Sequence, residues 1–245
     1  MHKKLLITLS CVFVAIEIVL HVLIFTTSGL TNSWVSFASI VTAFLFSLLL
    51  LSFDLNVILT QIALCTTVMA DLFLIIVEPM NQLVAMLFFS VTQICYFLRL
   101  YFNSKSKLEK IVHLFFRGLA IVLIVILALV ILKDKVDALS IVSVFYFANL
   151  VLNVIFAFVQ IKKSILFPIG LLFFMICDIF IGLQSAIGVY LDIPESNIIY
   201  QIAFSSFNWA WLFYVPAQVL IVLSLVFNKY TKKEQNITSL GIDKG

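Results

Sequence analysis

The chain contains a series of apolar runs of about 20 residues, the length that an α-helix needs to cross the ~30 Å hydrocarbon core of a membrane. Its 245 residues are 64% hydrophobic and 11% charged, with a mean hydropathy of +1.22. Soluble domains carry about 25% charged residues, so a soluble fold is excluded. Backbone groups in lipid must be paired within the segment, and the alternating pattern of a barrel is missing from the sequence. We therefore expect an all-α, polytopic membrane protein.

The apolar runs predict eight transmembrane helices with short connections, which form one domain over residues 1–227. Polar residues 228–245 are expected to form a cytoplasmic tail without regular structure. Residues 70–74 (ADLFL) resemble residues 177–181 (CDIFI) four helices later, which suggests two parallel four-helix halves. The predicted helices span residues 5–25, 34–52, 57–77, 82–102, 113–132, 138–160, 165–190 and 204–227.

Lysine and arginine predict the orientation, because the cytoplasmic connections of membrane proteins are rich in both. With the N-terminus inside, thirteen of the fifteen fall in cytoplasmic segments, and only Lys133 and Lys135 fall outside. Both termini are then cytoplasmic, in a protein that we expect in the plasma membrane. Anionic lipid head groups are expected to contact the densest basic group, which consists of Arg99, Lys105, Lys107, Lys110 and Arg117.

Three acidic residues, Glu17, Asp71 and Asp178, lie inside apolar runs. A charged acid at the membrane centre costs about 2.5–3.5 kcal/mol on insertion scales, so such residues are functional candidates. The three predicted helices run in the same direction, and each acid lies 12–14 residues past a predicted helix start. All three should therefore share one level, about 20 Å from the cytoplasmic face. Other polar side chains are predicted to reach a similar level: Gln93, Tyr96, Asn149, Asn153, Tyr214 and Gln218.

Asp71 and Asp178 are the candidates for chemistry. Two carboxyl groups in a low-dielectric site divide their roles, so that one is protonated and acts as an acid while the other ionises and acts as a base. The alternative is that each is neutral and only hydrogen-bonds the neighbouring amides, which stabilises helix packing. Glu17 and His21 are four residues apart and share a helix face, so they form a proton relay, or His21 only reaches the outer membrane interface and caps the helix. The spacing of a metal site is missing, so we predict neither a metal nor a cofactor.

Short motifs resemble the YhhN-type lysoplasmalogenase family of eight-helix membrane proteins over residues 65–102 and 165–225. The first is Asp71 with the following Leu-Phe-Leu, and the second is the Gly-Leu-Leu-Phe at 170–173 that leads to Asp178. Tyr214 with the Gln-Val-Leu-Ile at 218–221 is similar to the last helix of the family. The chain departs from the family pattern at Ala70, Gln93 and Cys177, where the family usually has Gly, His and Ser.

The resemblance implies hydrolysis of the vinyl ether bond of a lysophospholipid, with Asp71 and Asp178 as acid and base. Supporting roles are then implied for Glu17, His21, Gln93, Tyr96, Asn149, Tyr214 and Gln218. Membrane lipids are the expected partners, and nothing in the sequence indicates nucleic-acid binding. Two other hypotheses fit the residues: a proton-coupled small-molecule transporter, because intramembrane acids are typical of one, and a lipid-binding protein without catalytic activity. Against transport, the apolar runs show no clear helix break at the level of the acids.

Overall fold

The computed structural model describes residues 3–50, 52–104, 106–187 and 189–239, and it is all-helical with eight helices long and apolar enough to span a membrane. A π-helical segment, η1, continues α3, and a short helix, α8, precedes the last span. Two 3₁₀ turns, η2 and η3, lie at Lys133–Lys135 and Ile161–Lys163. The helices are α1 Lys3–Thr26, α2 Gly29–Leu48, α3 Leu55–Asp71, η1 Leu72–Ile76, α4 Gln82–Asn103, α5 Lys107–Leu132, α6 Ala138–Val159, α7 Leu166–Ala186, α8 Ile198–Ala203 and α9 Trp209–Ser239.

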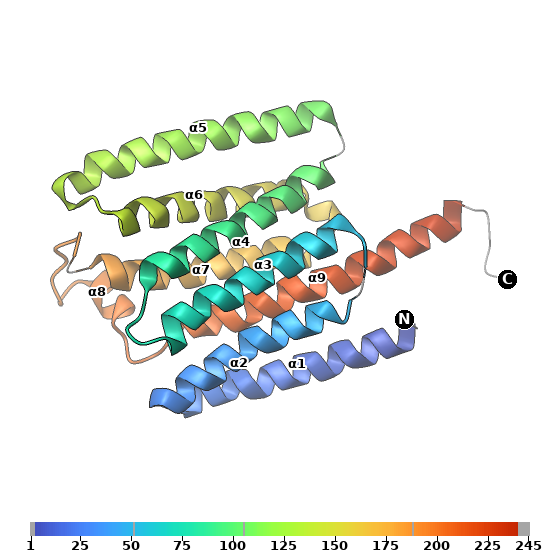
Figure 1. Ribbon diagram of the computed structural model, residues 1–245, viewed down its shortest axis with the longest axis horizontal. Coiled ribbons are helices and arrows are strands. Elements are labelled where there is room, and N and C mark those ends of the chain that lie inside the picture. The colour runs from blue at the N-terminus through green and yellow to red at the C-terminus, as the bar shows by residue number, and fades with distance from the viewer. Residues whose placement is uncertain (1–2, 51, 105, 188, 240–245) are drawn as a thin grey trace.

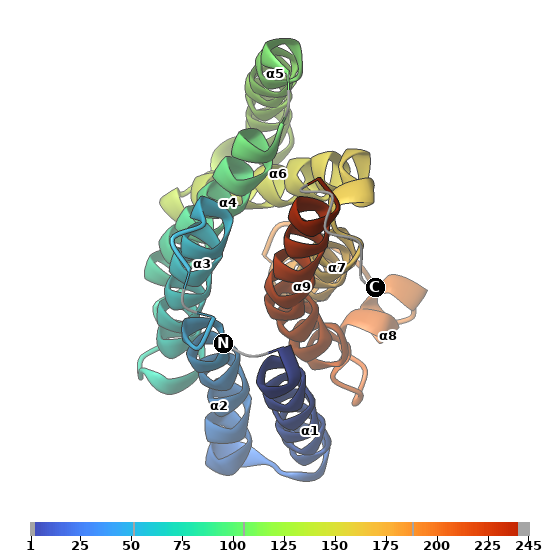
Figure 2. The same cartoon turned by 90° about the vertical axis from the view of Figure 1, so that its right-hand side faces the viewer.

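The long helices lie side by side in one bundle, with α1 and α2 at one edge and α5 at the other (Figure 1). Viewed along the bundle, α5 is the outermost helix and packs mainly on α6 (Figure 2). The start of α1 and the end of α9 lie on the same side of the bundle, which we call the N-terminal face. This arrangement confirms the predicted all-α membrane fold.

The helix pairs repeat between the two halves of the chain. The closest pairs are α3 with α4 and α7 with α9, which hold equivalent places in the two halves. In the same way α1–α2 corresponds to α5–α6, α2–α3 to α6–α7, and α2–α9 to α6–α4. The correspondence is incomplete, because α1 also packs on α9 whereas α5 stands at the edge. The packing thus supports the predicted two parallel four-helix halves.

Several helix ends differ from the predicted ones. Helix α2 begins at Gly29, since Gly29 adopts a φ of 60° that glycine reaches without a Cβ clash and that allows a tight turn after α1. Helix α5 begins at Lys107, where the Ser106 side chain caps the helix by accepting from the Glu109 backbone N–H. The first turns of both helices are polar, so hydropathy alone placed their starts too late.

The last part of the chain differs most from the prediction. Helix α7 ends at Ala186, the short helix α8 was not predicted, and α9 begins at Trp209 rather than at residue 204. Helix α9 continues past the predicted end at residue 227 to Ser239, so the prediction of a tail without regular structure was wrong for residues 228–239. Residues 240–245 lie outside the described part of the chain.

Gly170 allows the close approach of α7 and α9. A Cβ atom at this position would lie 2.8 Å from the Ile221 Cγ1 atom and 3.1 Å from both the Ala217 carbonyl oxygen and the Ile221 backbone nitrogen. Further along the same helix, a Cβ on Gly182 would meet no atom within 4 Å. The close packing of α7 on α9 at this point therefore depends on the missing side chain at Gly170.

We expect Gly170→Ala to destabilise the protein by about 1–3 kcal/mol, the usual effect of overpacking. Gly182→Ala is the matched control, and it should be neutral or stabilising by up to about 1 kcal/mol because alanine favours the helix. Unfolding of the purified variants in detergent measures both changes. Equal melting of the two variants would show that α7 and α9 do not depend on this contact.

Candidate active site

Asp71 is almost fully buried, with 3% of its surface exposed, at the end of α3. Its Oδ2 atom accepts a hydrogen bond of 2.6 Å from the hydroxyl of Tyr214 on α9. Tyr214 is itself held by ring contacts with Phe174 at 5.4 Å and Trp211 at 5.3 Å. The carboxyl group of Asp71 thus has a fixed position between α3 and α9.

Asp178 lies on α7 and is half-buried. Its Oδ2 atom accepts a hydrogen bond from the hydroxyl of Tyr146 on α6, a buried residue. Sequence reasoning did not single out Tyr146, although it shares a face of α6 with Asn149 and Asn153, at spacings of three and seven residues. Each aspartate is therefore paired with a tyrosine from a neighbouring helix.

The two aspartate–tyrosine pairs belong to one cluster. The carboxyl groups of Asp71 and Asp178 are close enough to interact electrostatically. Both of them also interact with the two tyrosine hydroxyls and with the buried thiol of Cys177. We call Asp71, Asp178, Tyr146, Tyr214 and Cys177 the acid cluster. It unites residues of α3, α6, α7 and α9, and Asp71 lies more than 70 residues before the other members.

Aromatic rings form one wall of the acid cluster. Phe89 on α4 contacts Tyr146 at 5.6 Å and Phe174 at 6.0 Å, and Phe174 in turn contacts Tyr214. The four rings form a continuous series from one aspartate–tyrosine pair to the other. Apolar side chains on this side of the cluster lower the local dielectric constant, which strengthens the electrostatic interactions of the carboxyl groups.

Directly after Asp71 the helix changes from α to π geometry over Leu72–Ile76, with the Val77 backbone N–H bonded to the Leu72 carbonyl at 2.9 Å. Such π turns are frequent at functional sites. No helix break was predicted here, and the residues of the sequence most able to break a helix near the acids are Pro216, Gly182 and Gly188. Helices α9 and α7 run through Pro216 and Gly182, and Gly188 lies outside the described residues. The irregular turn therefore lies beside an acid of the cluster.

Glu17 lies outside the acid cluster, between α1 and α2. It is buried, with 2% exposed, and its Oε2 atom accepts a 2.6 Å hydrogen bond from Ser39. Its Oε1 atom and the Nδ1 atom of His21 have no hydrogen-bond partner in the described part of the chain. His21 contacts Phe25 edge-on at 5.2 Å. No hydrogen bond or ring contact between residues that the structure describes joins Glu17 or His21 to either aspartate, so these contacts do not support the predicted supporting roles of the two residues.

Gln93 and Asn149 belong to a different network, centred on Arg117 of α5. Arg117 donates to the Oδ1 atoms of Asn149 and Asn153 at 2.6 and 2.5 Å. Asn153 in turn donates to Gln93 at 2.9 Å. His113 and Arg117 are the buried residues of α5, so this network attaches the outermost helix to α4 and α6.

The prediction that Arg99 and Arg117 contact lipid head groups was wrong. Both were expected at lipid head groups, but they are buried in the bundle with 1% and 5% of their surface exposed. Arg99 bonds Thr60 on α3 and Ser224 on α9. Tyr96 and Gln218, two further predicted supporting residues, are buried with 0% and 1% exposed. They lie on the same helices as Arg99 and Tyr214, between that arginine and the acid cluster.

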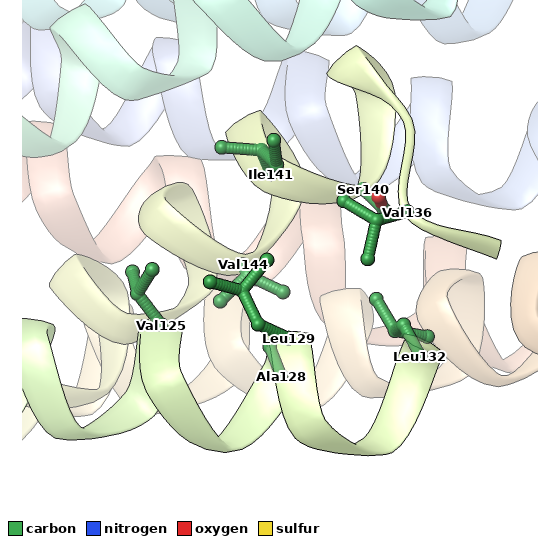
Figure 3. A pocket seen from close by; sticks show the side chains of 8 residues that line it. All are labelled: Val125, Ala128, Leu129, Leu132, Val136, Ser140, Ile141 and Val144. Carbon is green, nitrogen blue, oxygen red and sulfur yellow. The ribbon is translucent and has the colours of Figure 1, made fainter. Parts of the chain in front are cut away.

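A groove on the protein surface lies away from the acid cluster. It lies between the adjoining ends of α5 and α6 and contains none of the predicted site residues (Figure 3). Within the described residues, no group of three or more His, Cys, Asp or Glu side chains is placed to hold a metal ion. The lining of the groove is Val125, Ala128, Leu129, Leu132, Val136, Ser140, Ile141 and Val144.

Comparison with known proteins identifies the family. The model of the YhhN family matches residues 31–225, which include the whole acid cluster and exclude Glu17 and His21. No curated protein and no solved structure matches the chain. With the family match extending from the start of α2 to the last span, the chain belongs to the YhhN family.

Proposed function

We propose that the protein is a membrane hydrolase that cleaves the vinyl ether bond of a lysophospholipid, with Asp71 and Asp178 as its acid–base pair. The observation that carries the proposal is the acid cluster, in which two interacting carboxyl groups are each held by a tyrosine. Membership of the YhhN family is consistent with this activity. The expected substrate is a lipid, which explains why the reaction needs a site inside a membrane.

The chemistry needs one proton donor and one proton acceptor. The protonated carboxyl group gives its proton to the outer carbon of the vinyl ether, which leaves an oxocarbenium ion at the carbon that bears oxygen. Water adds to that carbon while the second carboxylate takes a proton from the water molecule. The resulting hemiacetal then collapses to a fatty aldehyde as its hydroxyl proton passes to the leaving glycerol oxygen. The proton that the second carboxylate took from water restores the single proton of the pair, because the proton given to carbon stays in the aldehyde. Glycoside hydrolysis uses two carboxyl groups against a similar cation.

The surroundings of the two carboxyl groups favour such a division of roles. Two interacting carboxylates cannot both be ionised cheaply when they are buried, so we infer that the pair holds one proton at the start of the reaction. Asp71 is deeply buried whereas Asp178 is half-buried. We infer that the lipid approaches the cluster from the Asp178 side, between α6 and α7. Release of a long-chain aldehyde from a lysoplasmalogen by the purified protein tests the proposal.

Transport is the second candidate, and the π turn favours it. Irregular backbone beside an intramembrane acid is typical of transporters, where it forms substrate and ion sites. The turn at Leu72–Ile76 directly follows Asp71. The apolar runs showed no clear helix break near the acids, but the structure has an irregular turn beside Asp71, so the predicted lack of a break no longer counts against transport. Proton-coupled uptake by protein in liposomes, without aldehyde release, would favour this candidate.

We also propose that the N-terminal face is cytoplasmic and that the membrane is the plasma membrane. Arg99 and Arg117 are buried, so they no longer count toward the orientation. Of the thirteen Lys and Arg residues predicted on the cytoplasmic side, eleven remain, compared with two on the outer side. The excess of positive charge on the cytoplasmic side therefore persists.

Cysteine labelling tests this orientation. In a chain without its native cysteines, an impermeant thiol reagent added to intact cells should label Glu195→Cys, in the loop before α8. It should not label Lys107→Cys, at the start of α5, until the cells are opened. Both positions are exposed, so accessibility to the reagent is decided by the side of the membrane. The reverse labelling pattern would invert the proposed topology.

A further inference from the structure

Several buried polar side chains extend from the acid cluster toward the N-terminal face. The far end of this series is Arg99, whose Nη1 and Nη2 atoms donate to Thr60 and Ser224 at 2.9 Å each. The guanidinium group lies 3.7 Å above the centre of the Phe167 ring and interacts electrostatically with Asp54. Arg99 thus joins α3, α4, α7 and α9 at one level of the bundle.

The distance from this level to the acid cluster follows from two helices independently. On α3, Thr60 and Asp71 are eleven residues apart, which corresponds to about 16 Å. On α9, Ser224 and Tyr214 are ten residues apart, which corresponds to about 15 Å. The two estimates agree, so a span of about 15 Å separates the guanidinium level from the acid cluster.

Polar groups without partners occupy this span. The Oε1 and Nε2 atoms of Gln218, the hydroxyl of Tyr96 and the Nε atom of Arg99 have no hydrogen-bond partner among the residues that the structure describes. Gln218 lies one turn from Tyr214, and Tyr96 lies about one turn from Arg99. A buried polar group left unpaired is destabilising. Such groups are normally paired with buried water molecules, each making two to four hydrogen bonds.

We propose that ordered water molecules bind between Arg99 and Asp71, where Tyr96 and Gln218 hold them by hydrogen bonds. We call these water molecules, together with the four residues Arg99, Tyr96, Gln218 and Asp71, the water column. Its role in the reaction rests on the proposed function: hydrolysis consumes one water molecule for each vinyl ether, and the acid cluster is enclosed by helices in lipid. The column then supplies that water. The cationic Arg99 repels hydronium ions, so the column admits water rather than protons.

The length of the column excludes a lipid phosphate as the ligand of Arg99. In a lysophospholipid, five bonds separate the vinyl ether oxygen from the phosphorus atom, a reach of about 6–7 Å at ordinary bond lengths. A lipid with its vinyl ether at Asp71 cannot place its phosphate at a guanidinium group about 15 Å away. Water is therefore the ligand that fits both the unpaired groups and the spacing.

Radiolytic hydroxyl-radical labelling of the full chain in nanodiscs tests the column, because X-rays generate radicals from bound water inside proteins. Tyr96 should be oxidised although its side chain is fully buried. Phe46 is the matched control, since it is buried, with 5% exposed, in an apolar cluster stacked on Phe13. Each yield is divided by that of the denatured chain. Labelling of Tyr96 no higher than that of Phe46 would overturn the proposal.

Gln218→Met removes the polar atoms while nearly keeping the side-chain volume. Labelling of Tyr96 should fall to the level of Phe46 in this variant, and unchanged labelling would remove Gln218 from the column. The result for the unaltered chain stands even if the variant does not fold. If Tyr96 is labelled but the protein releases no aldehyde, the water column stands and the proposed hydrolase fails. If aldehyde is released while Tyr96 is unlabelled, the hydrolase stands and the column fails.

Discussion

Asp71→Asn and Asp178→Asn should each lower the rate of aldehyde release by about 10²–10⁴-fold, the usual contribution of general acid–base catalysis. Asparagine nearly matches aspartate in size and can still accept the tyrosine hydrogen bond, but it can neither donate an acidic proton nor ionise. The fold should therefore survive, with a stability change of about 1 kcal/mol or less, the scale of hydrogen bonds inside membrane proteins. The measurement is aldehyde release from a lysoplasmalogen by detergent-purified variants, with thermal melting of the same samples.

Glu17→Gln is the matched control for the two aspartate variants. Glu17 is also a buried intramembrane acid, but its hydrogen bond goes to Ser39 outside the acid cluster. Its substitution should therefore change the rate much less. Undiminished release by both Asn variants would contradict the acid–base pair, and a loss as large in Glu17→Gln would show that the effect does not depend on the cluster.

Tyr146→Phe and Tyr214→Phe should each lower kcat by about ten- to a hundredfold and leave KM nearly unchanged. Each substitution removes one hydrogen bond to a carboxyl group, and bonds to charged groups contribute about 1.5–3 kcal/mol. Loss of that much stabilisation of the transition state would lower the rate by about ten- to a hundredfold. Because each tyrosine donates to an aspartate of the proposed acid–base pair, its effect should appear in kcat.

Tyr101→Phe supplies the control for the tyrosine variants. Tyr101 lies near the end of α4 and contacts Phe97, away from both aspartates. Wild-type rates are expected for this variant. If the variants at Tyr146 and Tyr214 matched it, the tyrosines would serve packing alone, and the acid cluster would not need them to position its carboxyl groups.

The fold could be predicted from the sequence because hydropathy acts over whole segments. Each span carries enough apolar residues that one polar side chain does not hide it. Turns are different, since they depend on single residues: the start of α2 depends on the φ of Gly29, and the start of α5 on the Ser106 cap. The cap was visible in advance, because Ser106 with Glu109 three residues later is the pattern of a capping box.

The site could be predicted only in part, because depth in the membrane does not determine the direction of a side chain. Asp71 and Asp178 share a depth and lie in one cluster, whereas Glu17 was assigned the same depth and lies between α1 and α2. Arg99 and Arg117 lie near helix ends in the sequence, yet they face the interior. Which face of a helix is buried depends on the neighbouring helices, and the sequence gives no direct signal of those neighbours in so uniformly apolar a chain.

The most direct test of the central claim compares two lysolipids that differ only in the bond at the first glycerol carbon, one a vinyl ether and the other a saturated alkyl ether. Protonation of carbon requires the double bond, so a hydrolase of the proposed kind can act on the first lipid alone. We predict that the purified wild-type protein releases a long-chain aldehyde from the vinyl ether and nothing from the alkyl ether. Failure of the folded protein to release aldehyde from the vinyl ether would contradict the proposed function.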